Sequence, residues 1–366
     1  MGEIAVKFGK RALVVTGGTP ERARPLCDRL AAKSITIRIF VAPGEPTTEL
    51  LLQGVRQAQA GHCEFVIGFG GGSALDTGKA IAALLTNGGD LLDYLEVVGL
   101  GQSLSKASAP YIAIPTTAGS GTEVTRNAVL KSPEHQVKVS LRSPLMLPRV
   151  ALIDPELTYT LPPDVTASTG LDAFTQVVEP FVSNQPNPLT DAICREGIQL
   201  TARSLHRAYE QGADPVAREG MSVVSLFGGL ALANARLGAV HGFAGPLGGM
   251  FPAPHGALCA RLLPFVMDMN VRALRERAPE SEMLYRYTQI ARMLTGHPAA
   301  TASDGIRWVQ DLCAALHVPP LAQYGMRNAD IPVVVENAAK ASSMKGNPIV
   351  LTPDEMPELT HDLKDL

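Results

Sequence analysis

The sequence of 366 residues has little charge, few aromatic side chains and no paired cysteine motif. Charged residues make up 18% of the chain, the net charge is −3, and no basic block is interleaved with aromatics, so we expect no nucleic-acid partner. No uninterrupted apolar run reaches the roughly 18 residues of a membrane span, so we expect no membrane partner. The five cysteines form no CxxC pair, which argues against a zinc ribbon or a disulfide scaffold.

What the sequence does contain is enough apolar residues for two cores, at 46% of its length. Residues 1–155 alternate short β-branched runs with helical stretches, which predicts a mostly parallel sheet covered by helices on both faces. Later residues are dominated by long stretches at helical period. We predict an α/β domain over residues 1–162 and an all-α domain over residues 163–366. The N-terminus lacks signal-peptide organisation, so we expect a reduced, cytoplasmic protein.

The segment "FVIGFGGGSALDTGKAIA" leads an apolar strand through a run of glycines into a helix. Glycines let the backbone approach a ligand, and the first helical turn offers N–H groups at a positive dipole end, a combination that suits a pyrophosphate. We expect this helix to open at Ser73. The other interpretation is an ordinary tight turn with a capping box between Ser73 and Asp76, and the two interpretations can hold together. The loop follows the third predicted strand and has no acid about 20 residues on in the role of ribose ligand, so it departs from the usual dinucleotide fingerprint.

A second loop, "IPTTAGSGTEVTRNAV", also follows a strand and is rich in hydroxyls and glycines. Loops at the carboxyl ends of parallel strands line the crevice where open α/β sheets bind ligands. Two ordinary connecting loops are the alternative. The following runs "NAVLKS" and "VKVSL" predict a small hairpin.

Five segments together resemble the iron-containing (group III) alcohol dehydrogenase family: "GGGSALDTGKA", "PTTAGSGTEVT", "LIDPELTYTLPP", "GLDAFTQVVEPFVS" and "VHGFAGPLGGMFPAPHG". They occur in the family's order and spacing over essentially the whole chain. The wider superfamily includes glycerol dehydrogenases, maleylacetate reductases and dehydroquinate synthases. The resemblance implies a Rossmann-like, dehydroquinate synthase-like N-terminal domain, a helical C-terminal domain, an active site in the cleft between them and a homodimer. It also implies hydride transfer between NAD(P) and a metal-polarised alcohol or carbonyl.

The resemblance assigns residues to both cofactors. Those implied to bind the dinucleotide are Gly70, Gly71, Gly72, Ser73, Asp76, Thr116, Thr117, Ser120 and Lys138. Those implied to hold Fe²⁺ or Zn²⁺ are Asp172, Gln176, His241 and His255, of which Asp172, His241 and His255 carry the catalytic assignment. Gln176 stands where the family has histidine, and a neutral carboxamide is the weaker ligand. Gly245 stands where relatives usually place a histidine close to the nicotinamide, and it cannot relay a proton.

Local chemistry agrees with much of this ligand set. Asp172 and Gln176, at i and i+4, share one face of an otherwise apolar helix, where an unpaired carboxylate is costly. We expect His241 to end a helix that prolines at 246, 252 and 254 stop from continuing to His255. The two imidazoles would then come from separate elements and converge.

Three rival functions stay open from sequence: a metal-independent reductase like maleylacetate reductase, a lyase like dehydroquinate synthase, and a non-catalytic nucleotide-binding homologue. After the second predicted strand Val41 or a neighbour occupies the place where NAD-preferring relatives often carry an aspartate. No arginine follows immediately to attract a 2′-phosphate. We expect NAD(H) ahead of NADP(H), and a small alcohol or aldehyde as substrate.

Overall fold

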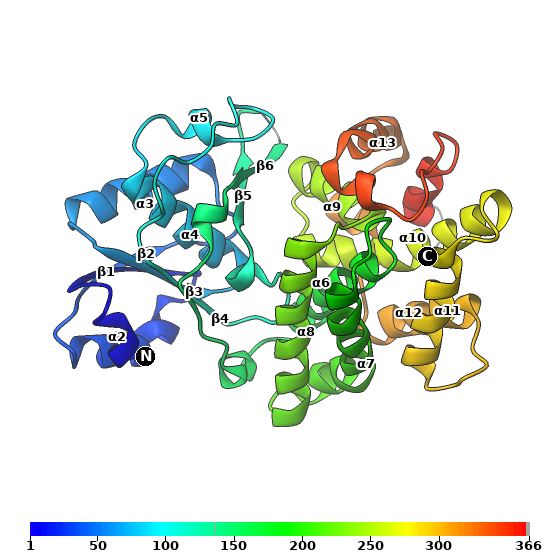
Figure 1. Cartoon of the computed structure of the whole chain (residues 1–366), viewed down its shortest axis with the longest axis horizontal. Helices are drawn as coiled ribbons and strands as arrows, with labels where there is room; N and C mark the ends of the chain where they lie inside the picture. The colour runs from blue at the N-terminus through cyan, green and yellow to red at the C-terminus, as the bar shows by residue number, and fades with distance from the viewer. Residues whose placement is uncertain (136, 364–366) are drawn as a thin grey trace. The chain divides into compact units, whose positions relative to one another are not determined.

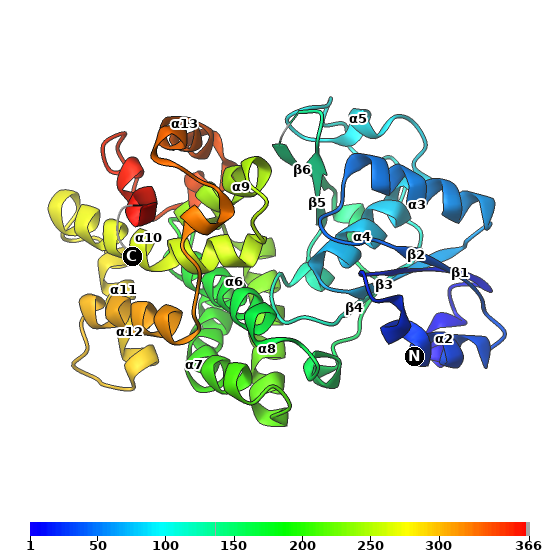
Figure 2. The ribbon, with the colours of Figure 1, turned by 180° about the vertical axis from the view of Figure 1, so that it is seen from behind.

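The computed structural model describes residues 1–135 and 137–363, and for 361–363 it describes the backbone. The polypeptide packs as two units, seen in Figure 1 and from behind in Figure 2. One unit holds Met1–Thr117 and Thr122–Leu157. The other holds Thr158–Leu366 together with the short segment Ala118–Gly121.

The first unit is built on a parallel sheet, which confirms the predicted fold class. Within the described residues this sheet has five strands in the order β2-β1-β3-β4-β7. The strands are β1 (Arg11–Thr16), β2 (Thr36–Val41), β3 (Phe65–Gly70), β4 (Tyr111–Pro115) and β7 (Val150–Ala151). Because the chain adds β2 on one side of β1 and β3 on the other, the winding direction reverses between β1 and β3. Such a reversal is where open parallel sheets bind ligands, beyond the carboxyl ends of their strands.

Helices cover both faces of this sheet, as the figures show. The helices are α1 (Gly2–Ala5), α2 (Arg24–Ala31), α3 (Thr48–Ala60), α4 (Gly72–Thr86) and α5 (Leu91–Tyr94). Side chains alternate along each strand, so Leu13 and Val15 join the core under α3 and α4 while Ala12 and Val14 join the core under α1 and α2. The predicted hairpin is present as the antiparallel pair β5 (Asn127–Ser132) and β6 (Val137–Arg142).

The second unit has helices joined by loops, with no strand among its described residues, and it has one large apolar core. Its helices are α6 (Pro163–Phe181), α7 (Pro188–Glu210), α8 (Pro215–Asn234), α9 (Ala239–Met250), α10 (His255–Arg277), α11 (Glu282–Thr295), α12 (Ala302–Ala315) and α13 (Ile331–Lys340). By length and composition α8 could cross a membrane, but 56% of its apolar window is buried, as in the core helices of many globular proteins. It packs against α6 and α7.

The local prediction for His241 is wrong, because this residue lies at the start of α9 and not at the end of a helix. Pro246 sits inside α9, although a proline there costs about 3 kcal/mol. Full burial of Phe243 and Leu247 holds the helix in spite of that cost. The break falls later, at residues 251–254, so His241 and His255 do come from separate helices, as expected.

Candidate functional site

A polar stripe runs along the buried helix α6. Asp172, Gln176 and Glu179 are spaced i, i+4 and i+7, which places them on one face. Each residue is 5% exposed or less, on a helix whose neighbouring side chains Phe174, Val177 and Val178 belong to the core. Polar groups buried this deeply require partners. The partners identify the site.

Four side chains converge on the middle of this stripe. The ligand atoms of Asp172, His241, His255 and Cys259 all lie within 4.8 Å of one another. His241 Nε2 is 3.6 Å from Asp172 Oδ1. The Cys259 sulfur is 3.6 Å from His255 Nε2 and 3.9 Å from His241 Nε2. The structure therefore brings together Asp172, His241 and His255, and it adds a thiol that the sequence reasoning overlooked.

A close approach of two helices produces this convergence. Gly256 follows His255 in the first turn of α10, and a Cβ built there would lie 2.4 Å from the Ser168 carbonyl oxygen on α6. Only a glycine lets α10 press so near to α6. His255 and Cys259 are one helical turn apart, so both side chains reach the level of Asp172. The spacing H-x-x-x-C is a signal that could have pointed to Cys259 from sequence.

Glu179 fixes the orientation of His241. The Glu179 carboxylate accepts hydrogen bonds from His241 Nδ1 at 2.6 Å and from the Val240 backbone N–H at 2.7 Å. A carboxylate offers only acceptors, so Nδ1 carries a proton and Nε2 is the ring atom that faces Asp172 and Cys259. Outer carboxylates of this kind are typical of metal-binding histidines. Sequence reasoning missed Glu179, although it continues the Asp172–Gln176 stripe.

The same carboxylate also caps the start of α9. Gly238 gives this helix no side-chain cap. Glu179 takes the Val240 N–H and the Asn347 side-chain oxygen takes the Ala239 N–H at 3.1 Å. A Cβ at Gly238 would lie 3.0 Å from both acceptor oxygens, so the glycine leaves room for them. Two acceptor oxygens, one from Glu179 and one from Asn347, thus replace a side-chain cap at this helix start.

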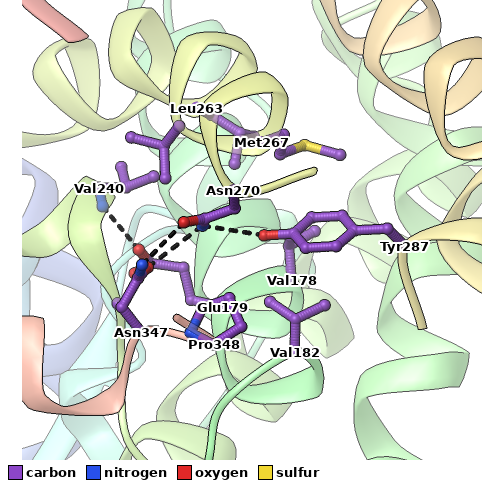
Figure 3. A pocket seen from close by; sticks show the side chains of 12 residues that line it. Val178, Glu179, Val182, Val240, Leu263, Met267, Asn270, Tyr287, Asn347 and Pro348 are labelled. Atoms are coloured by element: carbon purple, nitrogen blue, oxygen red, sulfur yellow. Dashed lines mark hydrogen bonds between the residues drawn. The ribbon is translucent and has the colours of Figure 1, made fainter. Parts of the chain in front are cut away.

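A hydrogen-bonded network behind Glu179 holds these groups in place (Figure 3). Asn270 and Asn347 exchange amide hydrogen bonds of 3.2 and 2.7 Å, and Asn270 also donates to the Tyr287 hydroxyl at 3.0 Å. The network borders a cavity of about 10 Å³, enough for one water molecule. Buried polar networks that are this well satisfied rigidify their surroundings. Glu179 therefore holds the imidazole of His241 directly, and the network holds the start of its helix through the Asn347 contact with Ala239.

The electrostatics fit a divalent cation. Burial alone would raise the pKa of Asp172, but the neighbouring His241 and His255 bring that pKa below its ordinary value. Burial opposes the charged form of His241, while Cys259, Glu179 and Asp172 raise the pKa of this imidazole well above its ordinary value. The Asp172 Oδ1 and Gln176 Oε1 atoms are buried without a hydrogen-bond partner among the described residues. An orphaned carboxylate oxygen beside two imidazoles and a thiol is a donor set for Zn²⁺ or Fe²⁺.

Gln176 takes a different position from its neighbours in the stripe. Its side-chain N–H donates to the Gly119 carbonyl oxygen at 3.3 Å, and its Oε1 lies 3.8 Å from the point where a Cβ on Gly228 would be. The side chain is thus packed between the segment Ala118–Gly121 and α8. The oxygen of its amide remains available as an acceptor.

The glycine loop lies between β3 and α4, as predicted, but its capping is different. The helix begins at Gly72 after Gly71, which supplies no side-chain cap. The predicted capping box between Ser73 and Asp76 is wrong, because Asp76 accepts hydrogen bonds from the Thr122 hydroxyl and, at 3.1 Å, from the Val129 N–H. Since Asp76 faces the β5 strand, no side chain among the described residues caps the start of α4. Uncapped N–H groups at a helix start form an anion-binding site.

The winding reversal of the sheet places this loop beside two others. A Cβ on Gly70 would lie 3.3 Å from the Gly17 backbone nitrogen after β1. The Thr116 N–H donates to the Gly70 carbonyl at 2.9 Å, and the Thr117 side chain would lie 3.3 Å from a Cβ on Gly71. Thr116 and Thr117 are thus brought to the glycine loop. Ser120 belongs by packing to the helical unit.

The remaining predicted cofactor residue, Lys138, lies on β6 and forms an ion pair with Glu45. Glu45 follows the end of β2 by four residues, so the structure supplies a carboxylate near the place where Val41 ends that strand. Sequence reasoning examined the residue at the strand end itself and missed Glu45.

Comparison with known proteins matches both units of the chain to one enzyme family. Residues 1–155 match the family described as iron-containing alcohol dehydrogenase, and residues 166–363 match its C-terminal domain. Alcohol dehydrogenase 4 of Schizosaccharomyces pombe is 36% identical over 363 residues, covering 97% of this chain and 82% of that protein.

Solved structures of alcohol and aldehyde oxidoreductases are similar to this chain over nearly its whole length. A 1,3-propanediol oxidoreductase matches with a TM-score of 0.91 at 32% identity, over 99% of this chain and 94% of that one. Sulfoacetaldehyde reductase from Bifidobacterium kashiwanohense, solved with NAD⁺, matches with a TM-score of 0.85 at 27% identity, over 99% and 93%. These matches confirm the predicted family and enzyme class. The chain belongs to the iron-containing alcohol dehydrogenase family, which uses NAD(P) and iron, and is an oxidoreductase that acts on CH–OH groups.

Proposed function

We propose that the chain interconverts small alcohols and aldehydes with NAD(H), and that Asp172, His241 and His255 hold the divalent cation. The convergence of these three side chains, with the Asp172 oxygen left without a hydrogen bond, is the observation that carries the assignment. When bound, the cation would polarise the substrate oxygen and the nicotinamide would carry the hydride.

In this proposal the chain's own groups bind and orient the cation and the dinucleotide. The charge of Asp172 and the two imidazoles attract the cation, and Glu179 keeps the Nε2 lone pair of His241 turned toward it. The first N–H groups of α4, at Gly72 and Ser73, would receive the pyrophosphate, with Thr117 beside them. This arrangement leaves the hydride chemistry to the cofactor and supplies position and charge.

Proton transfer is assigned to water. A Cβ on Gly245 would meet nothing within 4 Å, so this position is open space where relatives usually place a histidine. We propose that water in this space carries the proton and that the room admits substrates larger than ethanol. A Gly245→His variant should then lower activity on branched or aromatic aldehydes more than on small ones, measured as kcat/KM over a size series.

Cofactor preference is assigned to Glu45. Its carboxylate, beside Lys138, would repel a 2′-phosphate on the adenosine ribose, which supports NAD(H) over NADP(H). Glu45→Gln should raise kcat/KM for NADPH by about 5-fold, the equivalent of roughly 1 kcal/mol, with little change for NADH. Equal use of both cofactors by the unaltered enzyme would contradict this assignment.

The rival metal-independent reductase is favoured by one observation, the replacement of the family's histidine by Gln176. The decisive experiment is an aldehyde panel with NADH and NADPH, run on the purified enzyme, after chelation, and after addition of Fe²⁺ or Zn²⁺. Our proposal requires turnover that falls on chelation and returns with metal. Turnover that survives complete removal of metal would support the rival. Lack of any net NAD(P)H turnover would support the lyase or the non-catalytic homologue.

We also propose a homodimer that works in the cytoplasm. The five cysteines are free thiols, as expected in a reducing compartment. β2 is an edge strand of the described sheet, and Ile39 on it is 45% exposed, so this edge suits pairing with a second copy. Sedimentation of the purified protein, compared with an Ile39→Lys variant, tests this. A monomeric unaltered protein would refute it.

A further inference from the structure

We infer that Cys259 is a protein ligand of the metal centre, taking the coordination place that Gln176 leaves, and that the centre therefore prefers Zn²⁺ to Fe²⁺. The inference rests on the proposed metal site at Asp172, His241 and His255. It assigns a fourth ligand to that site and a metal preference that follows from the ligand's chemistry.

The distances match a tetrahedral site. Ligands at about 2.0–2.1 Å for nitrogen or oxygen and about 2.3 Å for sulfur are separated by roughly 3.3–3.6 Å along the edges of a tetrahedron. Three of the six separations here are 3.6 Å from His241 Nε2 to Asp172 Oδ1, and 3.6 and 3.9 Å from the Cys259 sulfur to the His255 and His241 Nε2 atoms. The other three pairs of ligand atoms lie within 4.8 Å of one another, so a cation would draw the four side chains together.

The thiol occupies the site and has no covalent partner elsewhere. Cys259 is fully buried and forms no disulfide. Its sulfur meets two imidazole nitrogens, an arrangement that an apolar core residue does not need. The buried Asp172 Oδ1, which is without a hydrogen-bond partner, belongs to the same four-atom cluster. This oxygen is an independent sign that a cation completes the group.

Gln176 is the weaker candidate for the fourth ligand. Its amide is neutral, and its N–H is engaged by the Gly119 carbonyl oxygen. A thiolate is soft and charged, so it binds Zn²⁺ well and favours it over Fe²⁺, for which harder oxygen and nitrogen ligands are better suited. With Cys259 in place of the family's histidine, the site would keep four protein ligands, and its preferred metal would change from Fe²⁺ to Zn²⁺.

Cobalt substitution tests the ligand directly. The purified enzyme is stripped, loaded with Co²⁺, and its absorption is recorded. The intense near-ultraviolet absorption of a thiolate–cobalt bond is expected in the unaltered enzyme and in Cys313→Ser, a matched change at another buried thiol of the same unit. Cys259→Ser should lose this band and keep the weaker visible bands of bound cobalt. Absence of the band in the unaltered enzyme, or its persistence in Cys259→Ser, overturns the inference.

Metal affinity supplies a second readout. Competition with a chromophoric chelator should show Zn²⁺ held at least about 10-fold less tightly by Cys259→Ser, since even an outer-shell partner is worth that much. The ratio of Zn²⁺ to Fe²⁺ affinity should fall in the same variant. Adding Gln176→His to Cys259→Ser should recover affinity without restoring the thiolate band. Unchanged affinity and metal ratio in Cys259→Ser would count against the inference.

The two proposals fail separately. Metal-dependent aldehyde reduction without a thiolate band would sink the role of Cys259 and leave the proposed function standing. A thiolate band in a protein that turns over no NAD(P)H would do the reverse.

Discussion

The outer carboxylate Glu179 offers the sharpest test of how the site is organised. Its two oxygens accept hydrogen bonds from His241 Nδ1 at 2.6 Å and from the Val240 N–H at 2.7 Å. Glu179→Gln keeps the shape but replaces one acceptor by an NH₂ donor. One orientation of the new amide opposes the Val240 N–H and leaves a buried donor unsatisfied, at a cost of about 1–3 kcal/mol.

The other orientation changes the histidine. An NH₂ donor at Nδ1 forces the imidazole proton onto Nε2, the atom that faces Asp172, and a protonated nitrogen cannot bind metal. Either way we expect Zn²⁺ affinity to fall about 10–100-fold, the usual loss for an outer-shell partner. That range corresponds to about 1.4–2.7 kcal/mol of binding free energy.

The measurement is a chelator-competition titration of the stripped enzyme with Zn²⁺. Glu336→Gln, which removes an exposed ion pair with Lys340, is the control and should bind as the unaltered enzyme does. Circular dichroism establishes that both variants are folded. If Glu179→Gln bound Zn²⁺ within 2-fold of the unaltered enzyme, the carboxylate would not be setting the state of His241.

Two further predictions concern stability. Gly121 has φ of +59°, and a Cβ there would lie 2.5 Å from the Gly229 backbone, so Gly121→Ala should lower the free energy of unfolding by about 2 kcal/mol or more in urea. Gly245→Ala, whose Cβ meets open space, should not lower it, and an equal loss in both variants would refute the packing argument. Burial lowers the pKa of Lys79 from 10.5 to about 8. The unfolded chain therefore binds more protons between pH 8 and 10.5, and the unfolding free energy due to Lys79 rises across that window by at most about 1.4 kcal/mol per pH unit. Lys79→Met should flatten this rise in urea titrations at pH 8 and 9.5, and an unchanged slope would contradict the assignment.

Much of the fold could be predicted from local pattern. The alternation of apolar runs and helical stretches gave the parallel sheet, because a strand buried on both faces must be apolar throughout, as β3 is. The hydrogen-bond partners of Asp76 were predicted wrongly. A serine and an aspartate three residues apart have the pattern of a capping box, and the local sequence does not show that the β5–β6 hairpin lies close enough to bind Asp76 instead. Local chemistry also misplaced His241, because Pro246 breaks isolated helices and only burial of Phe243 and Leu247 outweighs it.

The candidate site also has residues that the sequence predicts and residues that only the structure reveals. Asp172, His241 and His255 could be named from motifs, because residue type and spacing specify metal ligands even when the chain between them is unknown. Cys259 and Glu179 carry weaker signals, the spacing H-x-x-x-C and the continuation of the Asp172–Gln176 stripe, because a lone cysteine in a helix and a glutamate near a helix end have many other uses.

The amino-acid order therefore determined which groups the chain carries: glycine- and hydroxyl-rich loops after two strands, a helix with a buried acid, and imidazoles on a separate segment. Tertiary structure decided which atoms meet. The absence of a side chain at Gly256 lets α10 touch α6, and that contact brings the Cys259 sulfur to Asp172 and the imidazoles. Contacts between segments nearly 90 residues apart depend on how whole helices pack, and no local pattern records that packing.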